Sequence, residues 1–385
     1  MFHYTCLNPV SKVGLNCFGA LYEATSSMED ADAILVRSAD MHKLSVPGNV
    51  KCVARAGAGV NNIPLMDLGR RGIPVFNTPG ANANGVKELV FAAMLLAARD
   101  VVGGINWAAG QVGNDKVAAD TEKEKKKFAG YELSGKKLGV IGLGAIGRLV
   151  ANTAIHLGME VYGYDPYISV EGAWNLSKNV QHSKDLKEIY ANCDYITIHV
   201  PLMDATRGMI SADAFTLTRP TTVLINLARD VLVDEQAAVK ALEEGKLGKY
   251  VTDFPNPTVV GKPGVIAIPH LGASTEESED NCAVAAVKQV KDFLENGNLT
   301  NCVNFPNCQM GVCTTASRVG IFHDNVKSMI SQFTTALSYT NISNMCNVSR
   351  DTLAYTLLDL EGPVSEETAR SIEAIPGVLR VYVVK

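Results

Sequence analysis

Residues 137–148 read KLGVIGLGAIGR, and the organisation of the chain is best understood outward from this stretch. Its apolar run, Leu138–Ile141, predicts a buried strand, and apolar residues at helical spacing beyond the run predict a helix. Between the two stand Gly142, Gly144 and Gly147, in the order G-x-G-x-x-G. A glycine turn in that context predicts a dinucleotide site: the first glycine allows a tight turn, the second admits a pyrophosphate, and the third lets the helix pack closely on the strand. The helix N-terminus then offers free N–H groups to the phosphates.

An acid at the end of the next predicted strand, residues 160–165, supports this interpretation. Asp165 lies close to the offset of about 20 residues at which such sites place the carboxylate that binds the ribose hydroxyls. A carboxylate there repels a 2′-phosphate, and Pro166 and Tyr167 follow it without an adjacent arginine. The sequence therefore predicts NAD rather than NADP. The alternative is a glycine turn in another kind of α/β protein.

Length and composition limit the remaining possibilities. A chain of 385 residues, 47% of them hydrophobic, is expected to hold two or three domains of about 150 residues each. The net charge of −5 argues against a nucleic-acid partner, whose binding surface would be basic. Residues 1–11 lack the pattern of a signal peptide, and the longest apolar run, residues 89–98, is too short to span a membrane.

The nine cysteines have no regular spacing, which predicts reduced thiols and a cytoplasmic location. Cys302, Cys308 and Cys313 lie close together in the sequence, but their spacing matches no zinc pattern and no histidine completes a ligand set. No metal site is predicted.

The segment before the glycine turn predicts an open parallel sheet, because strand-like runs near residues 4–7, 33–37 and 52–55 alternate with helices. Ligands of such sheets lie beyond the carboxyl ends of the strands, where Arg37 and Arg55 fall. Two arginines in equivalent positions suit an anionic substrate, since guanidinium groups bind carboxylate or phosphate in a bidentate manner. The alternative for either arginine is a surface ion pair.

The strand–helix pattern continues to about residue 281, with further strands near residues 195–200, 222–228, 250–254 and 265–270. Such continuous apolar strands are typical of a parallel sheet covered on both faces. Long helices are predicted over residues 86–100 and 276–295.

Two residues that end these strands suit the oxidation of an alcohol. His270 could accept the hydroxyl proton, because histidine titrates near neutral pH. Arg229 could hold a neighbouring carboxylate. His199 also ends a strand and is interpreted as lining the cofactor cleft. The histidines at positions 3, 42, 156 and 182 are interpreted as structural.

These segments together resemble the D-2-hydroxyacid dehydrogenase family over essentially the whole chain, and in particular its members that oxidise 3-phosphoglycerate to 3-phosphohydroxypyruvate, the entry step of serine synthesis. The resemblance is carried by residues 36–38, 55–57, 77–79, the glycine motif with Asp165, 226–229 and 269–275. It implies that Arg229 orients the substrate carboxylate and that His270 is the acid–base group.

The resemblance also implies which residues bind substrate and cofactor. The substrate would contact Arg37, Ser38, Arg55, Ala56 and Gly57. NAD would contact Thr78, Gly142, Gly144, Ala145, Ile146, Gly147, Asp165, Val200, Leu227, Ala228, Asp253, Gly272 and Ala273.

The implied fold is α/β, with two doubly wound, Rossmann-like parallel-sheet domains. The substrate domain would be discontinuous, over residues 1–93 and 283–305, with the NAD domain inserted as residues 94–282. Family members usually dimerise through the inserted domain, so a homodimer or homotetramer is expected.

The C-terminal residues 314–385 resemble an ACT domain, a small ferredoxin-like module that senses amino acids. Their predicted order of strand, helix, two strands, helix and strand fits that module. The resemblance implies that His323, Asn325 and Asn341 bind L-serine as an effector.

Three positions depart from the family pattern. The loop after Asp253 lacks the glutamate that orients the histidine in the family, and Asn256 is a neutral substitute. We therefore expect the acid limb of the pH–rate profile at lower pH than in relatives that carry the glutamate. Asp230 stands where the family has glycine, and residues 325–328 lack the Pro-Gly of the effector loop.

Two alternative functions stay open. One is another D-2-hydroxyacid dehydrogenase, which reduces glyoxylate or hydroxypyruvate. The other is a non-catalytic regulator that binds NAD or an amino acid on the same fold.

Overall fold

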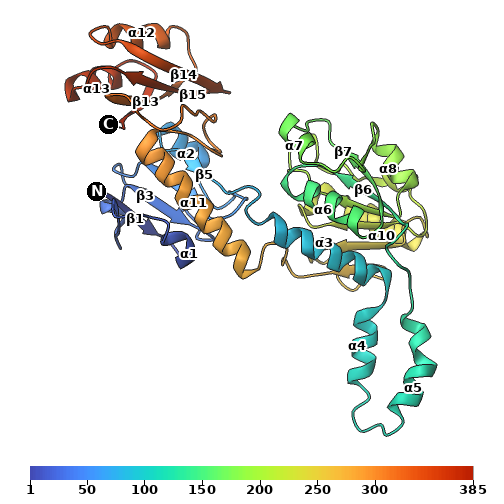
Figure 1. Ribbon diagram of the computed structural model, residues 1–385. Helices are drawn as coiled ribbons and strands as arrows, with labels where there is room; N and C mark the ends of the chain where they lie inside the picture. Colours follow the sequence, from blue (N-terminus) through green and yellow to red (C-terminus); the bar gives the residue numbers. More distant parts are fainter. Residues whose placement is uncertain (385) are drawn as a thin grey trace. The chain divides into compact units, whose positions relative to one another are not determined.

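The computed structural model describes residues 1–384. Its internal contacts divide the chain into two compact units. One unit comprises Ala83–Thr275, and the other comprises Met1–Asn82 together with the chain from Glu276 onward (Figure 1).

The unit of residues 83–275 is built on a seven-stranded parallel sheet in the order β12-β11-β10-β9-β6-β7-β8. Its strands are β6 (Lys137–Ile141), β7 (Glu160–Tyr164), β8 (Gln181–His182), β9 (Tyr195–Ile198), β10 (Val223–Asn226), β11 (Lys249–Thr252) and β12 (Val265–Ala267). The chain runs outward from β6 to β8 and then returns to place β9 on the other side of β6. The β6–β9 pair is therefore the switch point at which sheets of this kind bind their ligands.

Helices cover both faces of this sheet. They are α3 (Ala83–Ala98), α6 (Ala145–His156), α7 (Val170–Trp174), α8 (Leu186–Asn192), α9 (Ala212–Phe215) and α10 (Glu235–Glu243), with 3-10 turns η2 (Lys125–Phe128) and η3 (Asp230–Leu232). Val140 joins the core formed with α3 and α6, whereas its neighbour Ile141 joins the core formed with α8, α9 and α10. Both faces of each strand must therefore be apolar, which explains the continuous apolar runs in the sequence.

A helical hairpin, formed by α4 (Val101–Ala109) and α5 (Val117–Glu124), extends from the end of α3 away from this sheet (Figure 1). None of the residues of α4 or α5 is buried. Val101, Val102 and Ile105 are exposed apolar side chains on α4. The sequence did not predict this hairpin.

The other unit contains a five-stranded parallel sheet in the order β2-β1-β3-β4-β5. Its elements are β1 (Phe2–Cys6), α1 (Lys12–Leu15), β2 (Tyr22–Ala24), η1 (Met28–Asp30), β3 (Ala33–Val36), β4 (Cys52–Arg55), α2 (Leu65–Arg70) and β5 (Val75–Phe76). Helix α11 (Glu276–Asn296) buries Ala286, Val290 and Phe293 in one core with Leu35 and Ala54 of the sheet.

This packing moves the division of the chain away from the expected boundaries. The units divide at residues 82/83 and 275/276 rather than at 93/94 and 282/283. Residues of α3 on both sides of position 93 share a core with α6 and the strands of the seven-stranded sheet, while α11 from Cys282 onward shares a core with the five-stranded sheet.

The C-terminal segment has the expected order of elements and forms a four-stranded antiparallel sheet, β14-β15-β13-β16. The elements are β13 (Ser317–Asp324), α12 (Met329–Ala336), β14 (Ile342–Arg350), β15 (Leu353–Leu360), α13 (Glu366–Glu373) and β16 (Val378–Val383). Together with the two parallel sheets, it confirms the predicted α/β fold class.

The two faces of the antiparallel sheet bury different partners. One face packs Val319 and Ile321 against α12 and α13. The other places Phe322, Tyr355 and Tyr382 in the same core as Phe293 of α11. The C-terminal segment therefore shares a core with the five-stranded sheet and α11, where a separate domain was expected. Within residues 1–384, no helix has the length and apolar character needed to cross a membrane.

Candidate active site

The glycine turn between β6 and α6 has the geometry that a dinucleotide needs. Gly142 has a positive φ of 89°, and a Cβ there would lie 2.6 Å from the carbonyl oxygen of His199, which directly follows β9. A Cβ on Gly147 would lie 1.9 Å from the carbonyl oxygen of Gly142, so only glycine allows α6 to start this close to the turn. A Cβ on Gly144, by contrast, would meet no atom within 4 Å. The open space beside Gly144 suits a close-lying ligand.

The start of α6 is not capped by a side chain. Gly144 is the N-cap residue and has no side chain that could accept from the first N–H groups of the helix. These groups, beginning at Ala145 and Ile146, carry the positive end of the helix dipole. They fit a phosphate group.

Asp165, directly after β7, closes the turn. One carboxylate oxygen accepts a hydrogen bond from the backbone N of Leu143 (2.8 Å), and the other accepts from the backbone N of Tyr167 (2.9 Å). Each oxygen keeps a second lone pair, so the carboxylate can still accept from ribose hydroxyls. Asp165 thus both stabilises the glycine turn and offers acceptors beside it.

His199 lies at the end of β9, beside the glycine turn. Its Nε2 lies 3.0 Å from the Thr197 hydroxyl, and its Nδ1 is buried without a hydrogen-bond partner among the described residues. Burial lowers the pKa of His199 to about 3, so the ring is neutral at neutral pH. A neutral buried ring fits the predicted role of lining the cofactor cleft.

Three consecutive strands bring the candidate chemical groups to one edge of the sheet. Arg229 follows β10, Asp253 follows β11 and His270 follows β12, and these strands are neighbours in parallel register. Parallel strands end at the same edge, which is also the edge where the glycine turn begins.

The loop that carries Arg229 is folded by the buried Asn226. The Asn226 amide donates to the carbonyl oxygen of Arg229 (2.8 Å), and its oxygen accepts from the backbone N of Ala228 (3.2 Å). The Arg229 guanidinium donates to the Ala228 carbonyl (2.6 Å). The Asp230 carboxylate accepts from the backbone N of Val231 (2.9 Å). Among the described residues, the side chains of Arg229 and Asp230 thus bond to backbone atoms of their own loop and form no ion pair with each other.

Asp253 is the buried carboxylate of the site, with an exposed fraction of 1%. Burial raises its pKa, and the nearby charges of His270 and Arg229 oppose that shift. It accepts a hydrogen bond from the backbone of Gly272, while its Oδ1 has no partner in the part of the chain that the structure describes. A buried acceptor without a donor is costly on its own and fits an amide group of a ligand.

His270 is exposed, and its ring contacts Phe254 in an edge-to-face arrangement, with ring centroids 5.1 Å apart and planes at 90°. The predicted substitute Asn256 does not hydrogen-bond to His270. Its amide donates to Glu235 (2.7 Å) and to the carbonyl oxygen of Phe254 (3.1 Å). The roles of Phe254 and Glu235 were missed at the sequence level, where the only signal was an aromatic residue beside Asp253.

The arginines of the other unit are held by their own loops. Arg55 donates from Nε to the carbonyl oxygen of Arg37 (3.0 Å) and also contacts the carbonyl oxygen of Gly59. Arg37 forms an ion pair with Glu279 at the start of α11. A Cβ on Gly57 would lie 2.9 Å from the Arg55 guanidinium, so Gly57 leaves room for it.

Two further predicted residues lie in the same unit as these arginines. Thr78 is buried, and its backbone N donates to the carbonyl oxygen of Gly57 (3.1 Å). The Ser38 hydroxyl accepts from the side-chain amide of Asn8 (3.4 Å). Contact of Thr78 with NAD stays a prediction.

The predicted effector residues have different surroundings. His323 is 3% exposed, and its ring nitrogens lie 2.8 Å from the carbonyl oxygen of Asp324 and 2.9 Å from the Thr356 hydroxyl. Burial lowers its pKa. Asn325 is exposed and donates to the carbonyl oxygen of Asp351 (3.1 Å). Asn341 is exposed after α12. An effector would have to displace the contacts of His323 to reach its ring.

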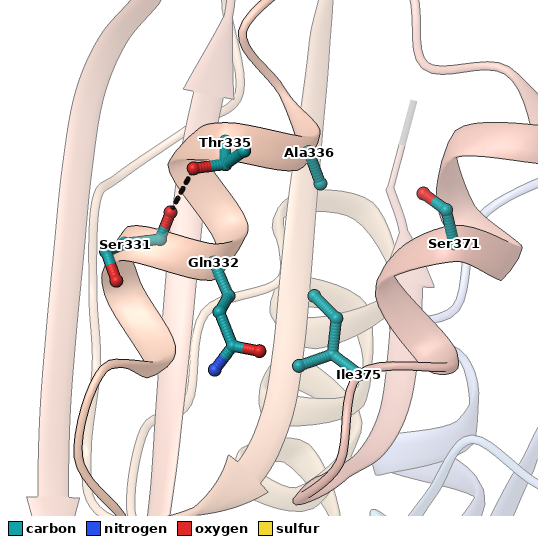
Figure 2. A pocket seen from close by; sticks show the side chains of 6 residues that line it. All are labelled: Ser331, Gln332, Thr335, Ala336, Ser371 and Ile375. Carbon is teal, nitrogen blue, oxygen red and sulfur yellow. Dashed lines mark hydrogen bonds between the residues drawn. The ribbon is translucent and has the colours of Figure 1, made fainter.

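A shallow pocket of about 440 Å³ lies between α12 and α13, and Figure 2 shows the side chains that line it. None of the predicted effector residues lines it. The hydroxyl groups of Ser331, Thr335 and Ser371 already donate to carbonyl oxygens of their own helices. Among residues 1–384, no group of three or more metal-ligating side chains has the arrangement of a metal site.

Comparisons with known proteins agree with the geometry of the glycine turn. Residues 91–272 match the model of the D-isomer specific 2-hydroxyacid dehydrogenase NAD binding domain. The chain is 37% identical over 298 residues to a D-3-phosphoglycerate dehydrogenase of Methanocaldococcus jannaschii, covering 74% of this chain and 54% of the relative. It is 35% identical over 291 residues to that of Homo sapiens, covering 73% and 52%. The chain thus spans about half the length of the curated relatives it matches.

Solved structures share the fold. An NAD⁺-bound 3-phosphoglycerate dehydrogenase of Entamoeba histolytica has a TM-score of 0.60 at 26% identity, covering 78% of this chain and 98% of that one. A D-2-hydroxyisocaproate dehydrogenase has a TM-score of 0.63 at 21% identity, covering 79% and 100%, which shows the fold alone.

NAD is the cofactor that these observations support. The uncapped start of α6, the carboxylate of Asp165 and the unpartnered Oδ1 of Asp253 fit its phosphates, its ribose and its carboxamide, respectively. Residues 91–272 are thus similar to the NAD-binding domain of the D-isomer specific 2-hydroxyacid dehydrogenases, and NAD is the cofactor of the chain.

Proposed function

We propose that the chain is an NAD-dependent dehydrogenase that oxidises 3-phosphoglycerate to 3-phosphohydroxypyruvate, the entry step of serine synthesis. The observation that carries the proposal is the alignment of Arg229, Asp253 and His270 after three neighbouring strands of the sheet that holds the glycine turn. The names of the matched relatives support the choice of substrate.

Each residue has a role that its surroundings allow. Bound NAD would supply the hydride acceptor. Arg229 is exposed and free of Asp230, so it can hold the substrate carboxylate. His270 is exposed and accepts the hydroxyl proton as the C–H bond breaks. The Asp253 Oδ1 would orient the carboxamide of the cofactor by accepting its N–H.

The substrate also carries a phosphate, and Arg37 and Arg55 are the proposed contacts for its negative charge. Arg37 directly follows β3 and Arg55 is the last residue of β4, so both lie at the carboxyl edge of the five-stranded sheet. The room that Gly57 leaves for Arg55 supports this role. Replacing Arg55 should raise KM for 3-phosphoglycerate more than KM for glyoxylate, which has no phosphate.

The proposal is tested by NADH formation at 340 nm with 3-phosphoglycerate and NAD at mildly alkaline pH. Arg229→Ala and His270→Ala should each lower turnover by about 100-fold or more while NADH affinity stays within a few-fold of wild type. Unchanged turnover in either variant would refute the assigned role.

The two alternatives predict other results. Activity with glyoxylate or hydroxypyruvate but not with 3-phosphoglycerate would favour another hydroxyacid dehydrogenase. NADH binding without turnover of any of these acids would favour a regulator. The retention of Arg229, Asp253 and His270 together argues against a regulator, since binding alone needs no acid–base group.

Regulation by L-serine is part of the proposal, through the ACT-like segment that contains His323, Asn325 and Asn341. Its strand order supports this assignment. Because His323 is enclosed by Asp324 and Thr356, we expect serine to act only at high concentration or after rearrangement of that strand end. Activity indifferent to millimolar serine would remove the sensor role.

We further propose a homodimer or homotetramer in the cytoplasm. The exposed apolar side chains of the α4–α5 hairpin support self-association. The nine cysteines, all free thiols, support a reducing compartment. A monomer in analytical ultracentrifugation would contradict the proposed homodimer or homotetramer.

A further inference from the structure

The proton acceptor His270 has an unusual support. Within residues 1–384, its ring nitrogens make no hydrogen bond, and the ring lies edge-to-face with the aromatic ring of Phe254. An edge-to-face pair of this kind is attractive beyond the burial of apolar area, because the positive edge of one ring meets the negative face of the other. Phe254 therefore has enough interaction energy to favour one orientation of the imidazole.

Phe254 is itself held by the loop of residues 253–258. Its backbone N donates to the Thr252 hydroxyl (3.2 Å), and its carbonyl oxygen accepts from the Asn256 amide (3.1 Å). The Asn256 side-chain oxygen accepts from the backbone N of Thr258 (2.9 Å). The side chain of Asn256 thus joins both ends of the loop.

A carboxylate from a different element anchors Asn256. Glu235, at the start of α10, accepts from the Asn256 amide (2.7 Å) and lies 3.4 Å from the Tyr250 hydroxyl. Glu235 is partly buried, and burial raises its pKa. This hydrogen bond links α10 to the loop and, through the loop, to the ring of Phe254.

We propose that Phe254 is the positioning residue of His270 and that the Glu235–Asn256 hydrogen bond holds Phe254 in place. An aromatic contact supported by a remote carboxylate thereby takes the place of a carboxylate bonded directly to the histidine. The inference rests on the proposed function for its consequence in catalysis, but not for the contact itself.

The charged groups around His270 do not provide the same support. Asp253 interacts with His270 electrostatically, yet it accepts from the backbone of Gly272 and is itself influenced by Arg229. Its position is fixed by these contacts, so it adds charge without holding the imidazole ring by a hydrogen bond. The orientation of the ring therefore depends on Phe254.

Four variants test the proposal. Phe254→Leu removes the aromatic ring, and Phe254→Tyr keeps it. Asn256→Ala removes the loop's hydrogen bonds, and Glu235→Gln keeps an acceptor for Asn256. We expect Phe254→Leu and Asn256→Ala each to lower kcat by about tenfold, with NADH affinity unchanged and KM little changed, since misplacing an acid–base group affects the chemical step. Phe254→Tyr and Glu235→Gln should retain most of kcat.

The double variant Phe254→Leu/Asn256→Ala decides whether the two residues act through one another. If Asn256 acts through Phe254, the double variant should be no slower than Phe254→Leu alone. The proposal would be overturned if the losses in kcat of the two single variants multiply in the double variant. It would also be overturned if the variants lose NADH affinity and thermal stability in parallel, without a specific loss in kcat.

A spectroscopic measurement separates this inference from the proposed function. In protein labelled with ¹³C-histidine, the His270 ring signal, assigned with His270→Gln, should shift in Phe254→Leu and in Asn256→Ala but much less in Phe254→Tyr. That result in a chain without dehydrogenase activity would support the contact while refuting the proposed function. An unmoved His270 signal, or full activity in Phe254→Leu, would overturn the inference.

Discussion

His270 and the loop beside it lead to the first prediction at the scale of single residues. The loop offers no carboxylate to the ring, and Asn256 is bonded to Glu235 instead. A protonated imidazole therefore lacks the partner that the glutamate of relatives supplies. We expect the acid limb of kcat/KM for 3-phosphoglycerate to lie at lower pH than in a relative with that glutamate. A limb at higher pH, measured in the same buffers, would contradict this.

His199 leads to a prediction about stability. Its pKa in the folded chain is about 3, against 6.5 for an unperturbed histidine, because the ring is buried. The unfolded chain binds the proton more readily between these values, so this contribution to stability is present above pH 6.5 and is lost as the pH falls toward 3. The loss has a limiting slope of about 1.4 kcal/mol per pH unit.

Urea unfolding of the wild type and of His199→Gln measures this contribution. Wild-type stability should fall more steeply than that of the variant as the pH decreases from 6.5 to 4.5. Parallel curves for the two proteins would show that His199 takes up its proton without unfolding.

At the scale of elements, the turn between β6 and α6 offers a matched pair of substitutions. In Gly147→Ala the new Cβ meets the Gly142 carbonyl oxygen at 1.9 Å, so the helix must move away from the strand. Overpacking of this kind costs about 1–3 kcal/mol. In Gly144→Ala the new Cβ meets no protein atom within 4 Å and can only obstruct a ligand.

We therefore expect Gly147→Ala to lose both thermal stability and NADH affinity, whereas Gly144→Ala should lose NADH affinity alone. Differential scanning fluorimetry and the quenching or transfer of NADH fluorescence measure the two quantities. Full NADH affinity in Gly144→Ala would mean that the dinucleotide does not approach the turn.

At the scale of the whole molecule, the C-terminal sheet is part of a larger core. Arg318 forms a buried, bidentate ion pair with Asp359 (2.6 and 2.9 Å). Its guanidinium also donates to the carbonyl oxygens of Asn296 and Gly311. It thus ties β13 and β15 to the end of α11 and the linker. The Tyr355 hydroxyl makes a second link by donating to the carbonyl oxygen of Gly297 (2.8 Å).

Breaking the buried pair should destabilise the unit of α11 and both its sheets together. We expect Asp359→Ala to lower the free energy of unfolding by about 3–5 kcal/mol, because it leaves the Arg318 charge buried without a partner. Glu366→Ala removes the exposed ion pair with Arg370 and should change the free energy of unfolding by less than about 0.5 kcal/mol. Unfolding of the C-terminal segment in a separate, earlier transition would contradict a shared core.

The sequence by itself determined the local elements of this protein and the positions of its chemical groups along the chain. The glycine turn, Asp165 and the strand ends at Arg229 and His270 follow from periodicity and residue type, which act over a few residues. The order of strands and helices along the ACT-like segment was likewise predictable. Boundaries shifted by a few residues, since strand ends depend on pairing with neighbours.

Only the tertiary structure decided the features that depend on contacts distant in sequence. The support of His270 by Phe254, the bond of Asn256 to Glu235, and the shared core of Phe293 with Phe322 and Tyr355 join residues that no local pattern relates. Only the structure likewise shows that α4 and α5 form a hairpin without buried residues. Packing selects such pairs because their shapes fit and because buried polar groups need hydrogen-bond partners. The spacing of residues along the chain specifies neither the shapes nor the partners.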